Sequence, residues 1–180
     1  MSNRNFKLAF VASTVLACVC AVAQAQGPAS VSFGKRAPTV EELKKAFAPE
    51  PKSSALMSMG LSSPVKKTID MELLFGFGSA EILPKVKGQL GAIGEFLQTA
   101  QLGPGEFLIE GHTDAVGVPE GNRVLSERRA QSVKTFLVTQ YKVSPAVIGT
   151  AGRGSDQLKD AQNPASEANR RVEFSMMVKE

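Results

Sequence analysis

A guanidinium stands among apolar side chains on one predicted helix, shortly after a carboxylate. The stretch from Gly111 to Thr139 carries Asp114 near its start, and a helix is predicted from about Asn122. At about 100° per residue, Arg129 and Asn122 fall within the apolar stripe of this helix. The stripe itself is formed by Leu125, Val133, Phe136 and Leu137. Because a lone desolvated guanidinium is costly, Arg129 must be paired or must line a pocket.

Two interpretations of these groups remain open. In the first, Arg129 and Asp114 form an internal salt bridge, because structural ion pairs are common in proteins. In the second, they bind a ligand that carries both a carboxylate and an ammonium. Asp114 follows the predicted strand Glu106–His112, so it stands at the C-terminal end of that strand, where sheets with helical crossovers bind ligands.

The elements that must position these residues follow from hydrophobic periodicity. Strands are predicted over Thr68–Phe75, Glu106–His112, Val147–Ala151 and Arg171–Val178, and helices from Pro84 to about Thr99 and from about Asn122 to about Gln140. This β-α-β-α-β-β order predicts an α+β fold, a two-layer sandwich with a mixed sheet of about four strands and helices on one face. The loop from Thr113 to Gly121 then lies at the strand ends. Alternation in the last strand places Arg170 on the buried side, as a second inward-leaning guanidinium.

Residues 1–25 have the pattern of a signal peptide. Arg4 and Lys7 precede the apolar run Leu8–Val22, and Ala23-Gln24-Ala25 is an A-x-A cleavage site. The apolar run is too short to make a good permanent transmembrane helix. A rival interpretation is a lipoprotein signal in which Cys18 is acylated. The residues after Cys18 stay apolar, which favours soluble export, and the mature chain would then contain no cysteine.

Residues 26–65 are rich in Pro, Ser and Ala, which predicts a tether rather than a core. One short helix is expected within it. Thr39 and Glu42 form a capping-box pattern, and Val40, Leu43 and Phe47 recur at helical spacing.

The composition suits one modest globular domain with extensions: 180 residues, 43% of them apolar and 21% charged. Arg4 and Lys7 are the only charged residues of the signal segment, so its removal lowers the formal net charge from +4 to +2. No basic cluster is interleaved with aromatic residues, which argues against nucleic acid as a partner. Weak positive charge is compatible with an anionic polymer.

Catalytic and metal-binding alternatives have little support in the sequence. His112-Thr113-Asp114 could suggest acid–base chemistry, but no nucleophile elbow or second catalytic carboxylate accompanies it, so no enzyme is predicted. His112 is the single histidine and is interpreted as a surface strand residue. No two-His spacing is present, so neither a metal site nor a cofactor is predicted. Gly152 and Gly154 are interpreted as a turn, because no phosphate-loop context surrounds them.

Four separated motifs resemble, in order, those of the OmpA-like peptidoglycan-binding domain. They are Leu74–Ala80, the stretch Gly111–Val133 with Asp114, Gly117, Asn122 and Arg129, the pair Gly152-x-Gly154, and Asn169–Glu173. The resemblance covers about residues 66–180, which are therefore predicted to be the domain. Ser166-Glu167 stands where the family often has a Gly-Arg pair, which is a departure beside the central cleft.

The resemblance implies non-catalytic binding of Gram-negative peptidoglycan through the diaminopimelate residue of the stem peptide. In this interpretation Asp114 meets the ammonium and Arg129 holds the carboxylate through its planar fork. Asn122 and Arg170 would complete the cleft, with Thr113 and Leu125 also in the ligand-binding set.

The implied location is the periplasm, in association with the outer membrane and the cell wall. An outer-membrane or Tol-type envelope protein is a further partner that relatives suggest, and the Tol-type reading needs the lipoprotein signal. A flagellar stator role needs a retained membrane helix with an ionisable residue, which Leu8–Val22 lacks.

Overall fold

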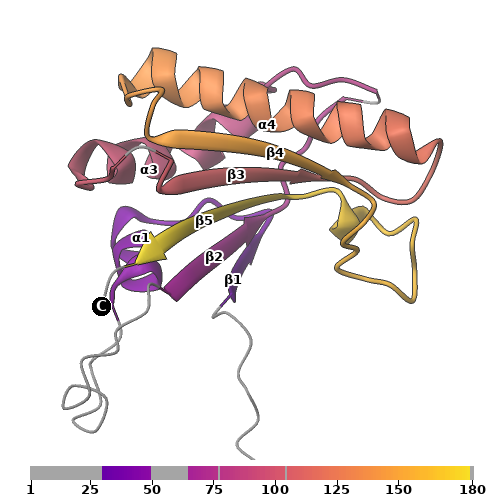
Figure 1. The fold of residues 1–180 in the computed structure, drawn as a ribbon, viewed down its shortest axis with the longest axis horizontal. Coiled ribbons are helices and arrows are strands. Elements are labelled where there is room, and N and C mark those ends of the chain that lie inside the picture. The colour runs from indigo at the N-terminus through magenta and orange to yellow at the C-terminus, as the bar shows by residue number, and fades with distance from the viewer. Residues whose placement is uncertain (1–29, 50–64, 77, 104, 179–180) are drawn as a thin grey trace, which may run out of the picture.

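The computed structural model of the chain describes residues 30–49, 65–76, 78–103 and 105–178. The predicted signal peptide, the Cys18 lipidation site and residues 50–64 of the predicted tether lie outside the described residues. Within the described ranges, a five-stranded mixed sheet carries three α-helices on one face (Figure 1). The predicted α+β fold class is confirmed, and the sheet has one strand more than expected.

The described elements alternate along the chain much as the periodicity predicts. They are β1 (Ser30–Gly34), α1 (Val40–Phe47), β2 (Val65–Met71), α3 (Pro84–Thr99), β3 (Phe107–His112), α4 (Pro119–Tyr141), β4 (Ile148–Gly154), the 3-10 helix η1 (Glu167–Asn169) and β5 (Val172–Val178). The strand order in space is β1-β2-β5-β3-β4. The outer pairs β1–β2 and β3–β4 are parallel, and β5 runs antiparallel to both β2 and β3.

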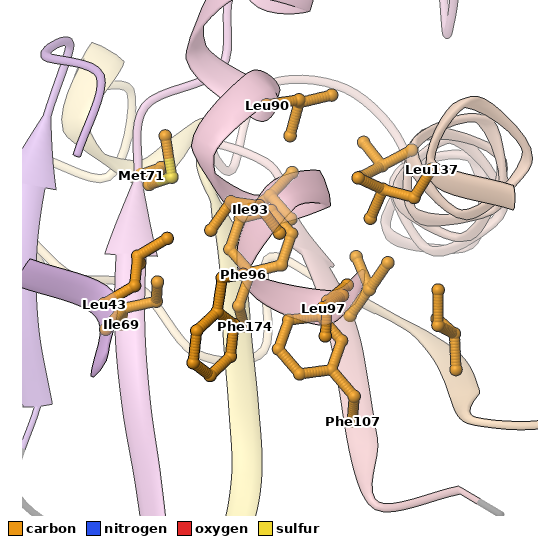
Figure 2. Packing of buried hydrophobic residues seen from close by; sticks show 14 of the residues in the cluster. Leu43, Ile69, Met71, Leu90, Ile93, Phe96, Leu97, Phe107, Leu137 and Phe174 are labelled. Carbon is orange, nitrogen blue, oxygen red and sulfur yellow. The ribbon is translucent and has the colours of Figure 1, made fainter. Parts of the chain in front are cut away.

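One face of the sheet and the inner sides of the three helices form the apolar core (Figure 2). Alternation along the strands turns Ile69, Phe107 and Phe174 to this face, where all three are buried. The ring centroids of Phe107 and Phe174 lie 5.9 Å apart. Leu43 from α1 and Leu137 from α4 pack into the same cluster, so the helices are held by burial of their apolar sides.

The first described residues belong to the fold, so the predicted tether is wrong for residues 30–49. β1 pairs in parallel with β2, and Phe33 on it is buried. The predicted capping box of Thr39 and Glu42 is present at the start of α1, and both Leu43 and Phe47 enter the core. Pairing with β2 and the burial of Phe33, Leu43 and Phe47 together dock this segment on the domain.

Several boundaries differ from the prediction at the ends that lead to the strand-end loops. α4 begins at Pro119, about one turn before the expected start at Asn122, with proline at its first position and no side-chain cap. β2 ends at Met71 and not at Phe75, which frees Phe75 to turn toward α4. No helix among the described residues has the length and hydropathy that a membrane span requires.

Two glycines let α4 lie directly on the sheet. A Cβ built on Gly111 in β3 would stand 2.2 Å from the carbonyl oxygen of Ser126, and one on Gly152 would stand 2.6 Å from that of Arg123. Real side chains never tolerate such distances from helix backbone. The close approach of the helix also allows the Ser126 hydroxyl to accept a hydrogen bond from Gly154 N at 2.9 Å. The start and middle of α4 are thereby fixed beside the ends of β3 and β4.

The second face of the sheet is polar and largely covered. Glu110 is buried there, with hydrogen bonds from Lys66 at 2.9 Å and from Arg153 Nε at 2.7 Å. Burial raises the pKa of Glu110, but the hydrogen bonds from these two cations outweigh it and leave the pKa below its ordinary value. Arg171 donates to the carbonyl of Gln157, which brings the loop after β4 against this face.

His112 lies on this polar face and is only 1% exposed, so its interpretation as a surface residue is wrong. Both ring nitrogens are buried and have no hydrogen-bond partner among the residues that the structure describes, and Glu173 Oε1 is 3.6 Å from Nε2. Burial, and next the charge of Arg171, lowers the pKa of His112 to about 4. Strand parity turns this side chain away from the core, as expected, but the charged side chains of Arg171 and Glu173 lie beside it on the polar face.

The buried histidine is expected to weaken the domain between pH 6.5 and pH 4.5. Its pKa is about 4 in the folded chain against 6.5 when unfolded, so the unfolded state takes up the proton first. Stability is complete above pH 6.5 and then falls by up to about 1.4 kcal/mol per pH unit. Urea unfolding at the two pH values, for wild type and for His112→Gln, measures this loss. Equal losses in the two proteins would show that other groups cause the acid sensitivity.

Candidate functional site

A cleft of about 550 Å³ opens where β3 and β4 end and β5 begins. Every ligand-binding residue that the sequence predicts lines it. They are Thr113 and Asp114 from the loop after β3, Asn122, Leu125 and Arg129 from α4, and Arg170 from the segment before β5. Phe75, Gly76, Gly78, Val116, Gly117 and Ala165 complete the lining. The strand-end loop from Thr113 therefore stands where the βαβ rule places it.

Arg129 is buried, with 6% of its surface exposed, and its guanidinium is held by neutral groups. Nε donates to the carbonyl of Ser79 at 3.0 Å, and the guanidinium carbon lies 4.9 Å from the centre of the Phe75 ring. Among the described residues Arg129 forms no ion pair, so the predicted alternative of an Arg129–Asp114 salt bridge is not realised. Burial, and next the charge of Arg170, lowers the pKa of Arg129. The site therefore holds a cation whose charge no carboxylate balances directly.

Asp114 is fixed at the mouth of the cleft by two contacts. Its Oδ1 accepts the backbone N–H of Val116 at 3.2 Å, which closes a short turn. Its Oδ2 accepts a hydrogen bond from Arg170 Nη1 at 2.9 Å. The carboxylate thus has a cationic partner in the resting cleft, but the partner is Arg170 and not Arg129.

The side chain of Arg170 is 40% exposed, so the prediction that strand parity places it on the buried side is wrong. β5 begins only at Val172, and Arg170 caps the end of η1, so the strand parity does not extend to it. Its second amino group reaches Glu167 at 3.0 Å. The hydrogen bond with Asp114 is the main cause that raises the pKa of Arg170.

Asn122 shapes the loop as well as lining the cleft. Its side-chain amide donates to the carbonyl of Asp114 at 3.3 Å and to that of Val116 at 3.0 Å. The amide group thereby ties the start of α4 to the loop that carries the carboxylate. Thr113 is also buried, and its backbone N–H donates to the carbonyl of Gly154 at 2.8 Å. Its hydroxyl has no hydrogen-bond partner in the described part of the chain.

Sequence reasoning missed two residues that build the site. Phe75 forms the aromatic wall against Arg129. Its position in the motif Leu74–Ala80 was the signal that could have found it. Asn169 is fully buried. Its side-chain amide donates to the carbonyls of Asp160, Asn163 and Pro164, and its Oδ1 accepts the backbone N–H of Asp160. The carbonyl of Pro164 in turn accepts Ala115 N–H at 2.9 Å. The sequence predicted a role in the site for the adjacent Arg170, but Asn169 is the residue that holds the cleft wall in place.

The arrangement has the polar groups and the apolar wall needed to bind an amino-acid terminus. Arg129 offers unpaired guanidinium N–H groups for a carboxylate, and Asp114 offers carboxylate oxygens for an ammonium. Phe75, Leu125 and Val116 give an apolar wall for an aliphatic chain. Within the described ranges, no group of three or more His, Cys, Asp or Glu side chains is placed to hold a metal ion.

Comparison with known proteins identifies relatives of this region. The model of the OmpA family matches residues 74–171, more than half of the chain. Outer membrane porin F of Pseudomonas aeruginosa is 31% identical over 108 residues, which cover 58% of this chain and 30% of the porin. Outer membrane protein A of Serratia marcescens is 32% identical over 123 residues, which cover 61% of this chain and 34% of that protein. The chain spans about a third of the length of these curated relatives.

A solved structure supports the fold independently. The OmpA-like domain of FopA1 from Francisella tularensis matches with a TM-score of 0.53 and 22% identity. The match covers 64% of this chain and 75% of that domain. At this level of identity the likeness concerns the arrangement of helices and strands.

Proposed function

We propose, from the premise that this chain belongs to the OmpA family, that it binds peptidoglycan non-covalently through the free amino-acid centre of diaminopimelate. The reaction class is reversible binding, with no bond made or broken. The proposed role is to link the exported protein, or the outer membrane, to the cell wall.

The observation that carries the proposal is the convergence of Arg129 and Asp114 in one cleft. The free end of diaminopimelate carries an ammonium and a carboxylate on one carbon, at the end of an aliphatic chain. The carboxylate pairs with the fork of Arg129, and the ammonium pairs with Asp114 beside Arg170. The apolar wall of Phe75 and Leu125 covers the methylene groups.

The names of the relatives support a location in the cell envelope. Outer membrane porin F and outer membrane protein A both contain a segment similar to this chain. A peptidoglycan ligand requires the domain to stand on the periplasmic side of that membrane. The signal pattern of residues 1–25 agrees with export to this compartment.

Isothermal titration of the purified chain with meso-diaminopimelate tests the proposal. Nα-acetyl-lysine amide is the matched ligand, because it keeps the aliphatic chain and the terminal ammonium but has no free carboxylate. Without a partner for Arg129, it should bind at least about tenfold more weakly than meso-diaminopimelate, which corresponds to about 1.4 kcal/mol. Equal affinity for the two ligands, or no heat with either of them, would contradict the proposed site.

A further inference from the structure

A chain of alternating charges connects the N-terminal strand to the cleft. Lys35, directly after β1, lies 2.8 Å from Glu167. Glu167 lies 3.0 Å from Arg170, and Arg170 lies 2.9 Å from Asp114. Lys35 and β1 lie outside residues 74–171, which the family model matches. These ion pairs therefore link the cleft to a segment that the family model does not include.

The N-terminal end of this charge chain is fixed in place. The buried side chain of Gln89 on α3 donates to the carbonyl of Lys35 at 2.9 Å. β1 is tied to the loop after β4 at a second point, where Lys159 reaches both Ser32 and Asp70 at 2.9 Å. Lys35 is therefore presented to Glu167 by a paired strand and a core helix, although its side chain is half exposed.

The contacts divide each charge between two neighbours. A hydrogen bond from Lys35 is the largest cause that lowers the pKa of Glu167, and the same contact raises the pKa of Lys35. Arg170 in turn bridges two carboxylates, those of Glu167 and Asp114. Removing the charge of Lys35 or of Glu167 therefore alters how strongly Arg170 binds Asp114.

We propose that Lys35 and Glu167 are positioning residues that set how strongly Arg170 competes with a ligand ammonium for Asp114. The inference rests on the proposed function. An ammonium that binds Asp114 must displace part of its contact with Arg170, and Glu167 gives Arg170 another partner. Lys35 binds the same carboxylate of Glu167. It therefore weakens the contact between Glu167 and Arg170.

This arrangement predicts effects of opposite sign on the affinity for meso-diaminopimelate. Glu167→Gln leaves Arg170 entirely to Asp114 and should weaken binding, whereas Lys35→Ala frees Glu167 and should tighten it. Each change should be about threefold, because exposed ion pairs contribute modestly. A role in stability alone would move both variants in the same direction. Lys35→Arg keeps the contact and should match wild type.

The double variant distinguishes this mechanism from simple charge attraction across space. Lys35 also lies 4.0 Å from Glu72, but its close contact, at 2.8 Å, is with Glu167. Lys35→Ala combined with Glu167→Gln should therefore bind like Glu167→Gln alone. Additive effects, or single variants that change affinity in the same direction, would overturn the inference. If wild type binds meso-diaminopimelate and all variants match it, the inference fails while the proposed function stands. If wild type does not bind, the proposed function fails.

Discussion

Co-sedimentation with purified peptidoglycan is expected to fall to background when Arg129 is replaced by alanine. Arg129 is the buried cation of the cleft, and among the described residues it has no carboxylate partner. Truncating one member of a buried, hydrogen-bonded charge pair costs about 2–5 kcal/mol, or at least about thirtyfold in affinity. The variant should stay folded, because Arg129 lines the cleft and its removal breaks no ion pair among the described residues.

Two variants make the Arg129 result specific. Arg128→Ala removes the same charge from an exposed position one residue away on α4, and it should bind like wild type. Arg129→Lys keeps the charge but loses the planar fork, so it should bind weakly. Circular dichroism checks the fold in each case. The assignment of the site would be wrong if the folded Arg129→Ala protein still sedimented with the wall.

Gly111→Ala is expected to destabilise the whole domain. The new methyl group would stand 2.2 Å from the carbonyl oxygen of Ser126, which belongs to the backbone of α4 and cannot rotate away. Either the helix lifts from β3 or the strand bends, and both separate Arg129 from the strand ends. Overpacking of this kind typically costs about 1–3 kcal/mol and occasionally more, and a contact with rigid backbone places Gly111→Ala at the upper end. Thermal unfolding measured by circular dichroism gives the loss directly.

Gly121→Ala is the matched control for this substitution. Gly121 lies on α4 near its start, and a Cβ added there meets nothing within 4 Å. Alanine at this position should stabilise the domain slightly, by about 0.5–1 kcal/mol, because it favours the helix. The two glycine variants should therefore shift the melting temperature in opposite directions. A Gly111→Ala protein as stable as wild type would mean that α4 does not press on β3.

Elements with strong periodicity could be read from the sequence, and those with one or two anchoring residues could not. Pro84 and the apolar spacing after it gave α3 its observed bounds, Pro84–Thr99. β1 was missed because only Phe33 of its residues is buried, which leaves no alternation to detect. Its pairing with β2 depends on contacts between segments far apart in the chain, which local sequence patterns cannot predict.

The members of the cleft were predictable, but their mutual contacts were not. The helical wheel placed Arg129 among apolar residues, and the structure buries it there. The wheel could not show that Asp114 would pair with Arg170, because that contact depends on the path of the chain before β5. Nor could it show that His112 is buried, because its neighbours Arg171 and Glu173 come from a segment far along the chain.

The resting pair between Arg170 and Asp114 limits how firmly one domain could hold a polymer. An ammonium that reaches Asp114 replaces a contact that already exists, so the exchange yields little net free energy. A single attachment of this kind would be short-lived. A sacculus repeats the same terminus over its whole surface, and avidity among many domains would then supply the strength that each lacks. If single domains dissociate and rebind one at a time, a growing wall would move relative to the membrane and stay attached to it.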